Sequence, residues 1–528
     1  MADLESHIQG LQNQLQSERD QGNPDTPDDI FVLRQHSALM DRFYREMGPA
    51  CDFRSHLTCV CCFMGTAQHP LPCGHVMCTS CVKDYGECVN KYDLRLQCCP
   101  LHPDETRWGS GCIIRFKPDF AGVRLLSLDG SGGVRGIVQL EVLQATQQYL
   151  GDKIPIHTFF DLIVGTSTGG LIAITVGAKN WSLSRCKREF KRFSHHAFTP
   201  REFHDLPVLQ HLTTLLHGSI YKTQPLYRSL RNALGEGLFY GGRRVDDTRN
   251  KTKVAISATE SEGRRVILIG NYNRSIDNDL EDVNRQGPFY QFRRPRDPAQ
   301  ELSFWEAAAA TSAAPPYFKP FFHESSHCYF LDGALYNNNP ARIAQQERKF
   351  LWPDVADRAP DIFLSVGTSQ NERDIMARMN EMHKESRSER LSRPTGPRPG
   401  FTTFTNSGQS GRIDSILGAE LAWREFVDLI ATDTAGEDSR YIRINPDICE
   451  NPPKLDAIDR IGQLQNATQT ALKRTKMKVQ IRRVAHRLDF RFFGVFLTDR
   501  GDVLTEVMVE YVINNIKNRK FYIKGNTI

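Results

Sequence analysis

The sequence lacks several features that would assign it to a class at once. No apolar segment follows Met1, so we do not expect a secretory signal peptide. No uninterrupted apolar run reaches the roughly 18 residues of a membrane-spanning helix, because the nearest one, residues 159–176, contains Asp161, Ser167 and several glycines. The formal net charge is only +5, which gives no argument for binding nucleic acid. Secreted, membrane-spanning and nucleic-acid-binding proteins are therefore not expected.

The chain has 528 residues, more than the roughly 250–300 that one hydrophobic core usually supports, so we expect several domains. A short helical seam near the start is formed by Leu4, Ile8, Leu11 and Leu15. Composition divides the sequence into a helical segment (1–50), a cysteine-rich module (51–117), an α/β domain (121–380), a Pro-, Gly- and Ser-rich linker (381–412) and a C-terminal region (413–528). The last of these is predicted to be helical and then to form strands at 488–497 and 520–525.

Most of the 14 cysteines lie between Cys51 and Cys112, beside histidines. This clustering favours metal ligation in a reducing compartment over disulfides. Eight ligands follow the spacing Cys-x2-Cys, Cys-x-His-x2-Cys-x2-Cys and Cys-x2-His, and closed structural zinc sites take four nitrogen or sulfur ligands each. Interleaved pairs would form one site from Cys59, Cys62, Cys78 and Cys81, and a second from Cys73, His75, Cys99 and His102.

This module resembles a RING finger, in which two structural Zn²⁺ ions are cross-braced. The resemblance implies recruitment of a ubiquitin-conjugating enzyme, and docking of another protein is an equally good interpretation. Cys61 and Cys98 stand one place from predicted ligands and are alternative ligands. Buried thiols without a metal are the remaining interpretation.

From Val123 onward, apolar strands alternate with helices. The strands are expected within VRLLSL (123–128), FFDLIV (159–164), KVAISAT (253–259), RRVILIG (264–270) and DIFLSVG (361–367). Such alternation predicts an α/β fold with a central, largely parallel sheet.

The stretch from Gly165 to Gly169 fits G-x-S-x-G, a sharp strand-to-helix turn that exposes the serine, here Ser167. A serine hydroxyl is a weak nucleophile unless a neighbour accepts its proton. A second strand ends at Asp332-Gly333, which places a carboxylate where active sites of open α/β sheets gather. A plain turn is the alternative interpretation at both places.

A glycine-rich loop, LDGSGGVRG, lies between the first strand and the next helix. Its backbone can direct N–H groups at an anion, either a phosphate or the oxyanion of an acyl-transfer intermediate. No Gly-Lys-Ser/Thr follows, which disfavours a nucleotide phosphate loop. A dinucleotide-binding loop would leave Ser167 unexplained.

The glycine-rich loop, G-x-S-x-G and Asp-Gly-Ala, in this order, resemble the patatin-like phospholipase family. The similarity runs from about Val123 to Thr368, includes FWEAAAATSAAPPYFKPF (304–321), and continues into RYIRINPD (440–447) as in fungal members. It implies a three-layer sandwich and a calcium-independent lipid acyl hydrolase without a catalytic cofactor. Such an enzyme would be cytoplasmic, peripheral on membranes, and would cleave phospholipids or other acyl lipids.

The same resemblance implies roles for single residues. Ser167 would be the nucleophile and Asp332 the base, without a histidine, and an acyl-serine would form before water releases the fatty acid. The oxyanion hole would comprise Gly130, Ser131, Gly132, Gly133 and Arg135.

Two departures from the family pattern bear on activity. Family loops read D-G-G-G-x-[RK]-G, whereas D-G-S-G-G-V-R-G is one residue longer. Either Ser131 is accommodated as an insertion, or the oxyanion hole is misaligned and the enzyme is slow. Ala309 also stands where relatives often have a basic residue.

Other interpretations stay open. An ordinary α/β-hydrolase would need a late histidine, for which His383 and His486 are the candidates. A protein of a different class would be a RING-bearing ubiquitin ligase or scaffold with a weak or inactive lipid-sensing domain. Residues 471–490 form a basic amphipathic pattern that either lies on anionic lipid or packs on its own domain.

Overall fold

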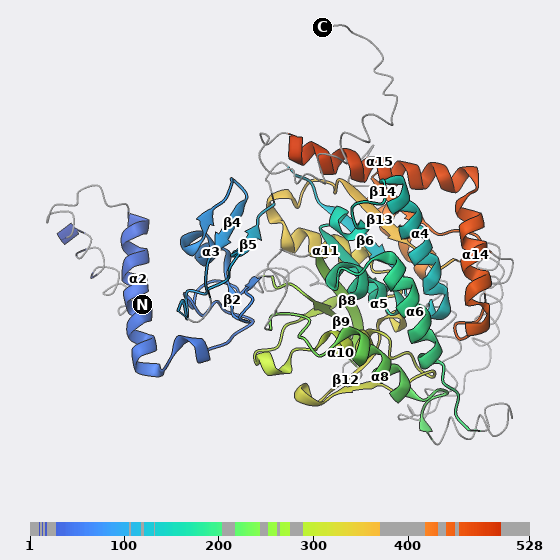
Figure 1. Cartoon of the computed structure of the whole chain (residues 1–528), viewed down its shortest axis with the longest axis horizontal. Helices are drawn as coiled ribbons and strands as arrows, with labels where there is room; N and C mark the ends of the chain where they lie inside the picture. The colour runs from blue at the N-terminus through green and yellow to red at the C-terminus, as the bar shows by residue number, and fades with distance from the viewer. Residues whose placement is uncertain are drawn as a thin grey trace, which may run out of the picture. The chain divides into compact units, whose positions relative to one another are not determined.

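The computed structural model (Figure 1) describes residues 28–104, 107–117, 121–130, 132–202, 217–242, 252–260, 265–274, 289–369, 418–430, 440–448 and 453–497, with isolated positions before residue 28. The chain divides into two compact units: Met1–Arg115 with two short later stretches, and the remainder from Phe116. The expected seam (Leu4 to Leu15), the linker (381–412) and the strand-like run 520–525 lie outside the described residues. The five-part division of the chain stays a prediction.

The first unit contains a helix and a small cysteine-rich module. Its elements are α2 (Asp28–Met47), β1 (His69–Pro70), β2 (Val76–Met77), α3 (Thr79–Tyr85), β3 (Glu87–Cys88), β4 (Asp93–Leu96) and β5 (Cys112–Arg115). The strands pair antiparallel, β1 with β2 and β3–β4–β5 in order. The end of α2 contacts the module, because the Tyr44 hydroxyl donates to the Val60 carbonyl and the Phe43 ring packs on Phe63.

The second unit contains a sheet of nine described strands. They are β6 (Arg124–Leu128), β7 (Leu162–Thr166), β8 (Lys253–Glu260), β9 (Arg265–Gly270), β10 (Tyr290–Arg293), β11 (Phe321–His323), β12 (Cys328–Asp332), β13 (Ile362–Val366) and β14 (Tyr441–Ile444). The order is β10-β9-β8-β7-β6-β13-β14, with β12 on the end of β8 and β11 beside β12. Along this order the pairs β8–β7, β7–β6, β6–β13 and β13–β14 are parallel. The pairs β8–β9, β8–β12 and β11–β12 are antiparallel. This arrangement confirms the predicted, largely parallel α/β sheet.

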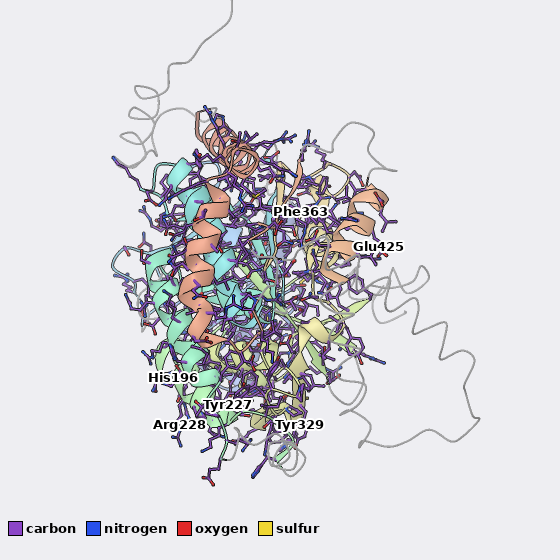
Figure 2. The ribbon with its side chains drawn as sticks, turned by 90° about the vertical axis from the view of Figure 1, so that its right-hand side faces the viewer. His196, Tyr227, Arg228, Tyr329, Phe363 and Glu425 are labelled. Carbon is purple, nitrogen blue, oxygen red and sulfur yellow. The ribbon has the colours of Figure 1, made fainter. Side chains whose placement is uncertain are left out.

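Helices cover both faces of the sheet, which explains why its central strands are apolar throughout. One face carries α4 (Gly136–Tyr149), α5 (Thr168–Ala173), α6 (Leu183–Ala197), α8 (Thr223–Leu234), α10 (Phe304–Thr311), α14 (Ile461–Leu472) and α15 (Thr475–Leu497). The other carries α11 (Ala341–Leu351) and the helix at 418–430. Figure 2 shows the layers edge-on, with Phe363 of β13 between His196 of α6 and Glu425 of the far helix.

The prediction of a strand at 488–497 was wrong, because these residues continue α15. Ile481, Val484 and Leu488 are buried at helical spacing in the core, so the helix is already formed and packed where the run begins. Adding a residue to a formed helix is far easier than nucleating a new element. A short apolar run is ambiguous between helix and strand when it is considered alone.

The basic pattern at 471–490 forms two helices rather than one. α14 ends at Leu472 and α15 begins at Thr475, with the exposed Lys473 and Arg474 between them. The apolar side of α15 is buried in the protein's own core. This arrangement supports the interpretation in which the helix packs on its own domain.

Of the helices in the described part of the chain, none combines the length and the apolar character needed to cross a bilayer.

Candidate active site

The strand register brings Ser167 and Asp332 together. Thr166, the last residue of β7, pairs with Ser257 of β8, and the next residue of β8, Ala258, pairs with Asp332 at the end of β12. Ser167 follows Thr166 directly and therefore lies beside that carboxylate. Its Oγ donates a hydrogen bond to Asp332 Oδ2 at 2.5 Å, and both residues are buried.

The backbone at Ser167 has a conformation that residues other than glycine rarely adopt, with φ 53° and ψ −121°. Such a conformation persists only where its surroundings hold it. Here the next turn approaches closely: a Cβ at Gly169 would lie 2.3 Å from the Leu128 carbonyl oxygen. Only glycine at position 169 lets α5 begin against the end of β6, and this contact orients the Ser167 hydroxyl.

Thr311, which the sequence analysis did not single out, also holds this turn. Its Oγ1 accepts a hydrogen bond from the Ser167 N–H at 2.9 Å and donates to the Ser257 carbonyl at 2.7 Å. Thr311 is the last residue of α10, which begins in a capping box between Ser303 and Glu306. The hydroxyl thus links the serine turn to β8, although nothing in the Ala-Thr-Ser sequence itself indicates this contact.

Burial strongly perturbs the Asp332 carboxyl. Desolvation raises its pKa to about 7, and hydrogen bonds from the Ser167 hydroxyl and the Ala334 N–H lower that pKa only in part. No cationic side chain in the described part of the chain forms an ion pair with Asp332. A carboxyl whose pKa lies near neutrality is suited to accept a proton and later return it.

Ser167 and Asp332 open into an apolar pocket of about 110 Å³. Rings and aliphatic side chains from three regions line it: Phe190, Phe193 and Phe198 from α6 and its end, Leu226 from α8, and Tyr317 and Phe318. The last two belong to the aromatic-rich stretch 316–322, whose Phe322 is exposed. The α6 residues were not predicted, because their positions read as an ordinary amphipathic helix.

The backbone amides of the predicted oxyanion-hole residues differ in whether they are already hydrogen-bonded within the protein. The Gly130 N–H donates to the Asn338 carbonyl at 2.8 Å, and the Arg135 N–H donates to the Gly132 carbonyl at 2.7 Å. Both amides are therefore engaged within the protein, and Ser131 lies outside the described residues. The Gly132 and Gly133 amides have no acceptor among the described residues, and Gly133 lines the pocket.

Comparison with known proteins identifies this part of the chain. Residues 126–344 match the family of patatin-like phospholipases. The chain contains a patatin-like phospholipase domain. Human calcium-independent phospholipase A2-gamma is 26% identical over 360 residues, which cover 68% of this chain and 39% of that protein. A cGAMP-activated phospholipase of Vibrio cholerae is 29% identical over 262 residues, covering 47% of this chain and 64% of the relative.

A third relative, the 85/88 kDa calcium-independent phospholipase A2 of Rattus norvegicus, is 30% identical over 226 residues, 42% of this chain and 23% of that protein. The chain thus spans less than two thirds of the length of each of these three relatives. The crystal structure of VipD from Legionella pneumophila aligns over 69% of this chain and 70% of its own, at 13% identity and a TM-score of 0.27. That similarity is too low to support an argument.

Outside the patatin-like domain, two clusters of Cys and His side chains can bind metal. They comprise Cys59, Cys62, Cys78 and Cys81, and Cys73, His75, Cys99 and His102, the two sets that the spacing groups together. The ligand atoms of each set lie within 4.8 Å of one another. Neither alternative ligand, Cys61 or Cys98, belongs to a cluster of the described residues.

The donor sets fit a structural metal ion. Four thiolate or imidazole donors that converge from different loops suit a closed tetrahedral site. Backbone N–H groups also point at the sulfur atoms of the first cluster: Gly65 N–H lies 3.4 Å from Cys62 Sγ, and Cys81 N–H lies 3.4 Å from Cys78 Sγ. Such donors orient the thiolates that bind a metal.

Proposed function

We propose that the patatin-like domain hydrolyses fatty-acyl esters of phospholipids, with Ser167 as nucleophile and Asp332 as base. The observation that carries the proposal is the 2.5 Å hydrogen bond from Ser167 to a buried carboxylate, at the side of an apolar pocket. Membership of the domain in a family of carboxylic-ester hydrolases supports it. The aromatic lining of the pocket is suited to an acyl chain.

The chemistry needs two proton transfers in each half of the reaction. Asp332 accepts the Ser167 proton as Oγ attacks the acyl carbonyl, and the oxyanion that forms is stabilised by the Gly132 and Gly133 amides. The carbonyl re-forms as the ester C–O bond breaks, and Asp332 returns its proton to the departing alcohol. Water, deprotonated by Asp332, then attacks the acyl-serine, and the fatty acid leaves as Ser167 recovers its proton.

The test is fatty-acid release from mixed phospholipid vesicles in the presence of a calcium chelator. We expect release by the wild type and its loss in Ser167→Ala and Asp332→Asn. The matched control is Ser194→Ala, because Ser194 also lines the pocket but donates to the Phe190 carbonyl. A wild type that releases no fatty acid from any lipid would overturn the proposal and favour the scaffold interpretation.

We further propose that each Cys/His cluster binds one structural Zn²⁺ and that the module docks a protein partner. Met64 and Phe63, in the loop that follows Cys62, are 82% and 43% exposed, which offers an apolar contact beside the first cluster. Recruitment of a ubiquitin-conjugating enzyme is the partner that the RING resemblance favours. Ubiquitin-chain formation with a panel of such enzymes, lost in Met64→Asp, would support this partner, and no chains with any of them would count against it.

The proposed location is the cytoplasmic face of a membrane. Phospholipid substrate requires contact with a lipid surface, and thiols that bind metal suit a reducing compartment. Fractionation of cells that express the full chain would test this location.

A further inference from the structure

The glycine-rich loop is held by a residue that lies far beyond the matched family region 126–344. Asp129, where the loop begins, accepts two hydrogen bonds from the Arg443 guanidinium, at 2.6 Å to Oδ2 and 3.3 Å to Oδ1. Arg443 belongs to β14 and also contacts Ser365 and Glu420. Asp129 is 2% and the Arg443 side chain 7% exposed. A buried, two-point ion pair therefore fixes the start of the loop.

A second contact holds the other end of the loop. The Val134 N–H donates to the Leu455 carbonyl at 2.9 Å. Gly133, with φ +47°, allows this approach, because a Cβ there would lie 2.2 Å from the same oxygen. Leu455 also lines the pocket.

The segment that carries Leu455 is itself anchored. The next residue, Asp456, accepts a hydrogen bond from the Tyr221 hydroxyl at 2.6 Å. Downstream, Gln465 and Gln469 of α14 donate to the buried Glu141 of α4 at 2.8 and 3.0 Å. Residues 453–472 are therefore joined to the helical layer that covers the site.

We propose that Arg443 and the Leu455 backbone are positioning groups that hold the elongated glycine-rich loop with its Gly132 and Gly133 amides facing Ser167. This inference rests on the proposed hydrolase function. The extra residue of the loop lies between the two contacts, with Asp129 and Gly130 tied on one side and Val134 on the other. The unit competent for catalysis then extends at least to residue 455, more than a hundred residues past the matched region.

The first test compares steady-state kinetics of full-length variants on a soluble short-chain ester. Arg443→Gln removes the cation from Asp129, and Arg443→Lys keeps a charge without two-point geometry. The matched control is Arg124→Gln, which breaks a partly buried Arg–Asp161 pair at the opposite end of the same strand, β6. For Arg443→Gln we expect kcat per folded molecule to fall about 10²-fold or more, as when an oxyanion donor is lost, with KM within about threefold.

Arg443→Lys should retain an intermediate kcat, and Arg124→Gln should lower the melting temperature while keeping kcat within about twofold. If Arg443→Gln and Arg124→Gln lose kcat equally, Arg443 is only structural and the proposal is overturned. The kinetic test requires an active wild type.

The second test does not depend on activity. Hydrogen exchange is measured over residues 129–136 in the full-length Ser167→Ala protein, alone and with Arg443→Gln or Arg124→Gln added. We expect at least tenfold faster exchange in this loop with Arg443→Gln and no change there with Arg124→Gln. Unchanged exchange with Arg443→Gln would overturn the positioning role. An inactive wild type would overturn the proposed function alone, and the exchange result would still decide this inference.

Discussion

Ser167 and Asp332, the proposed proton acceptor, form a pair in which burial raises the pKa of the carboxyl. Of the two candidate histidines for a conventional triad, His486 is an exposed residue of α15 and does not line the pocket, and His383 lies outside the described residues. Because desolvation raises the pKa of Asp332 to about 7, its carboxyl changes charge close to neutral pH.

This pKa should set the pH dependence of the proposed reaction. Only the ionised carboxylate can accept the Ser167 proton, so kcat/KM should fall about tenfold for each pH unit below about 7 and level off above it. A pH–rate profile on a soluble ester measures this directly. A profile that stays flat from pH 5 to 8 would show that Asp332 is not the titrating base, or that its pKa is close to the ordinary value.

Thr311 offers a second prediction for a single residue. Thr311→Val keeps the shape but removes the hydroxyl that bonds to Ser167 N–H and to the Ser257 carbonyl. Leaving these groups unpaired should cost about 1–3 kcal/mol in the free energy of unfolding and lower kcat by relaxing the strained turn. The control is Thr468→Val: Thr468 is a buried threonine of α14 whose hydroxyl donates to the Leu464 carbonyl of its own helix. Equal effects of both variants on kcat would contradict the assigned role.

Among the elements, those with a long apolar pattern were predictable from sequence, and those defined by pairing were not. The runs at 123–128 and 159–164 indicate buried strands because apolar residues fill both faces. Nothing in CYFLD indicates that β12 pairs antiparallel with the far end of β8, since register depends on contacts between segments distant in sequence. The motifs could therefore name Ser167 and Asp332, but the contact between them could not be derived from either strand.

The element with the wrong prediction, α15, yields a test of its own. Ile481→Ala should reduce the free energy of unfolding by about 2–4 kcal/mol, because the side chain is 1% exposed within the core. Val479→Ala is the matched control on the same helix, since Val479 is 61% exposed, and should change stability by no more than about 0.5 kcal/mol. Chemical denaturation measures both. Similar small effects would mean that the apolar side of α15 is not packed as described.

In the whole molecule, the two Cys/His clusters and the Ser167–Asp332 pair belong to different compact units. The first unit has a small core, so metal binding should supply much of its folding free energy. We expect a strong chelator to release two zinc ions per chain and unfold this unit, while esterase activity stays within about twofold. Metal analysis, calorimetry and the ester assay test this together, with added zinc as the reversal control. Loss of activity in proportion to lost zinc would contradict the expected independence.

The sequence predicted the organisation of the whole molecule only in part. Ligand spacing identifies the Cys and His pairs, because the two members of each pair are close in sequence. Interleaving these pairs gives the two sets of four that converge in space. The dependence of the glycine-rich loop on Arg443 and Leu455 had no such local signal. Arg443 lies in the stretch 440–447 that resembles fungal members, but neither that stretch nor the residues around Leu455 indicate a contact with the loop, which arises from pairing of β13 with β14 and from docking of α14 on α4.

The antiparallel junction of β8 with β12 has a consequence for how the proposed hydrolase can diversify. The proposed nucleophile directly follows β7 and its proposed base ends β12, and these two strands pair with neighbouring residues of β8, whereas the walls of the pocket come from α6, α8 and the turn after α10. Changes of chain-length preference can therefore accumulate in the helices without moving the reacting atoms. A library restricted to Phe190, Phe193 and Leu226 would sample new lipid selectivities on an intact catalytic frame.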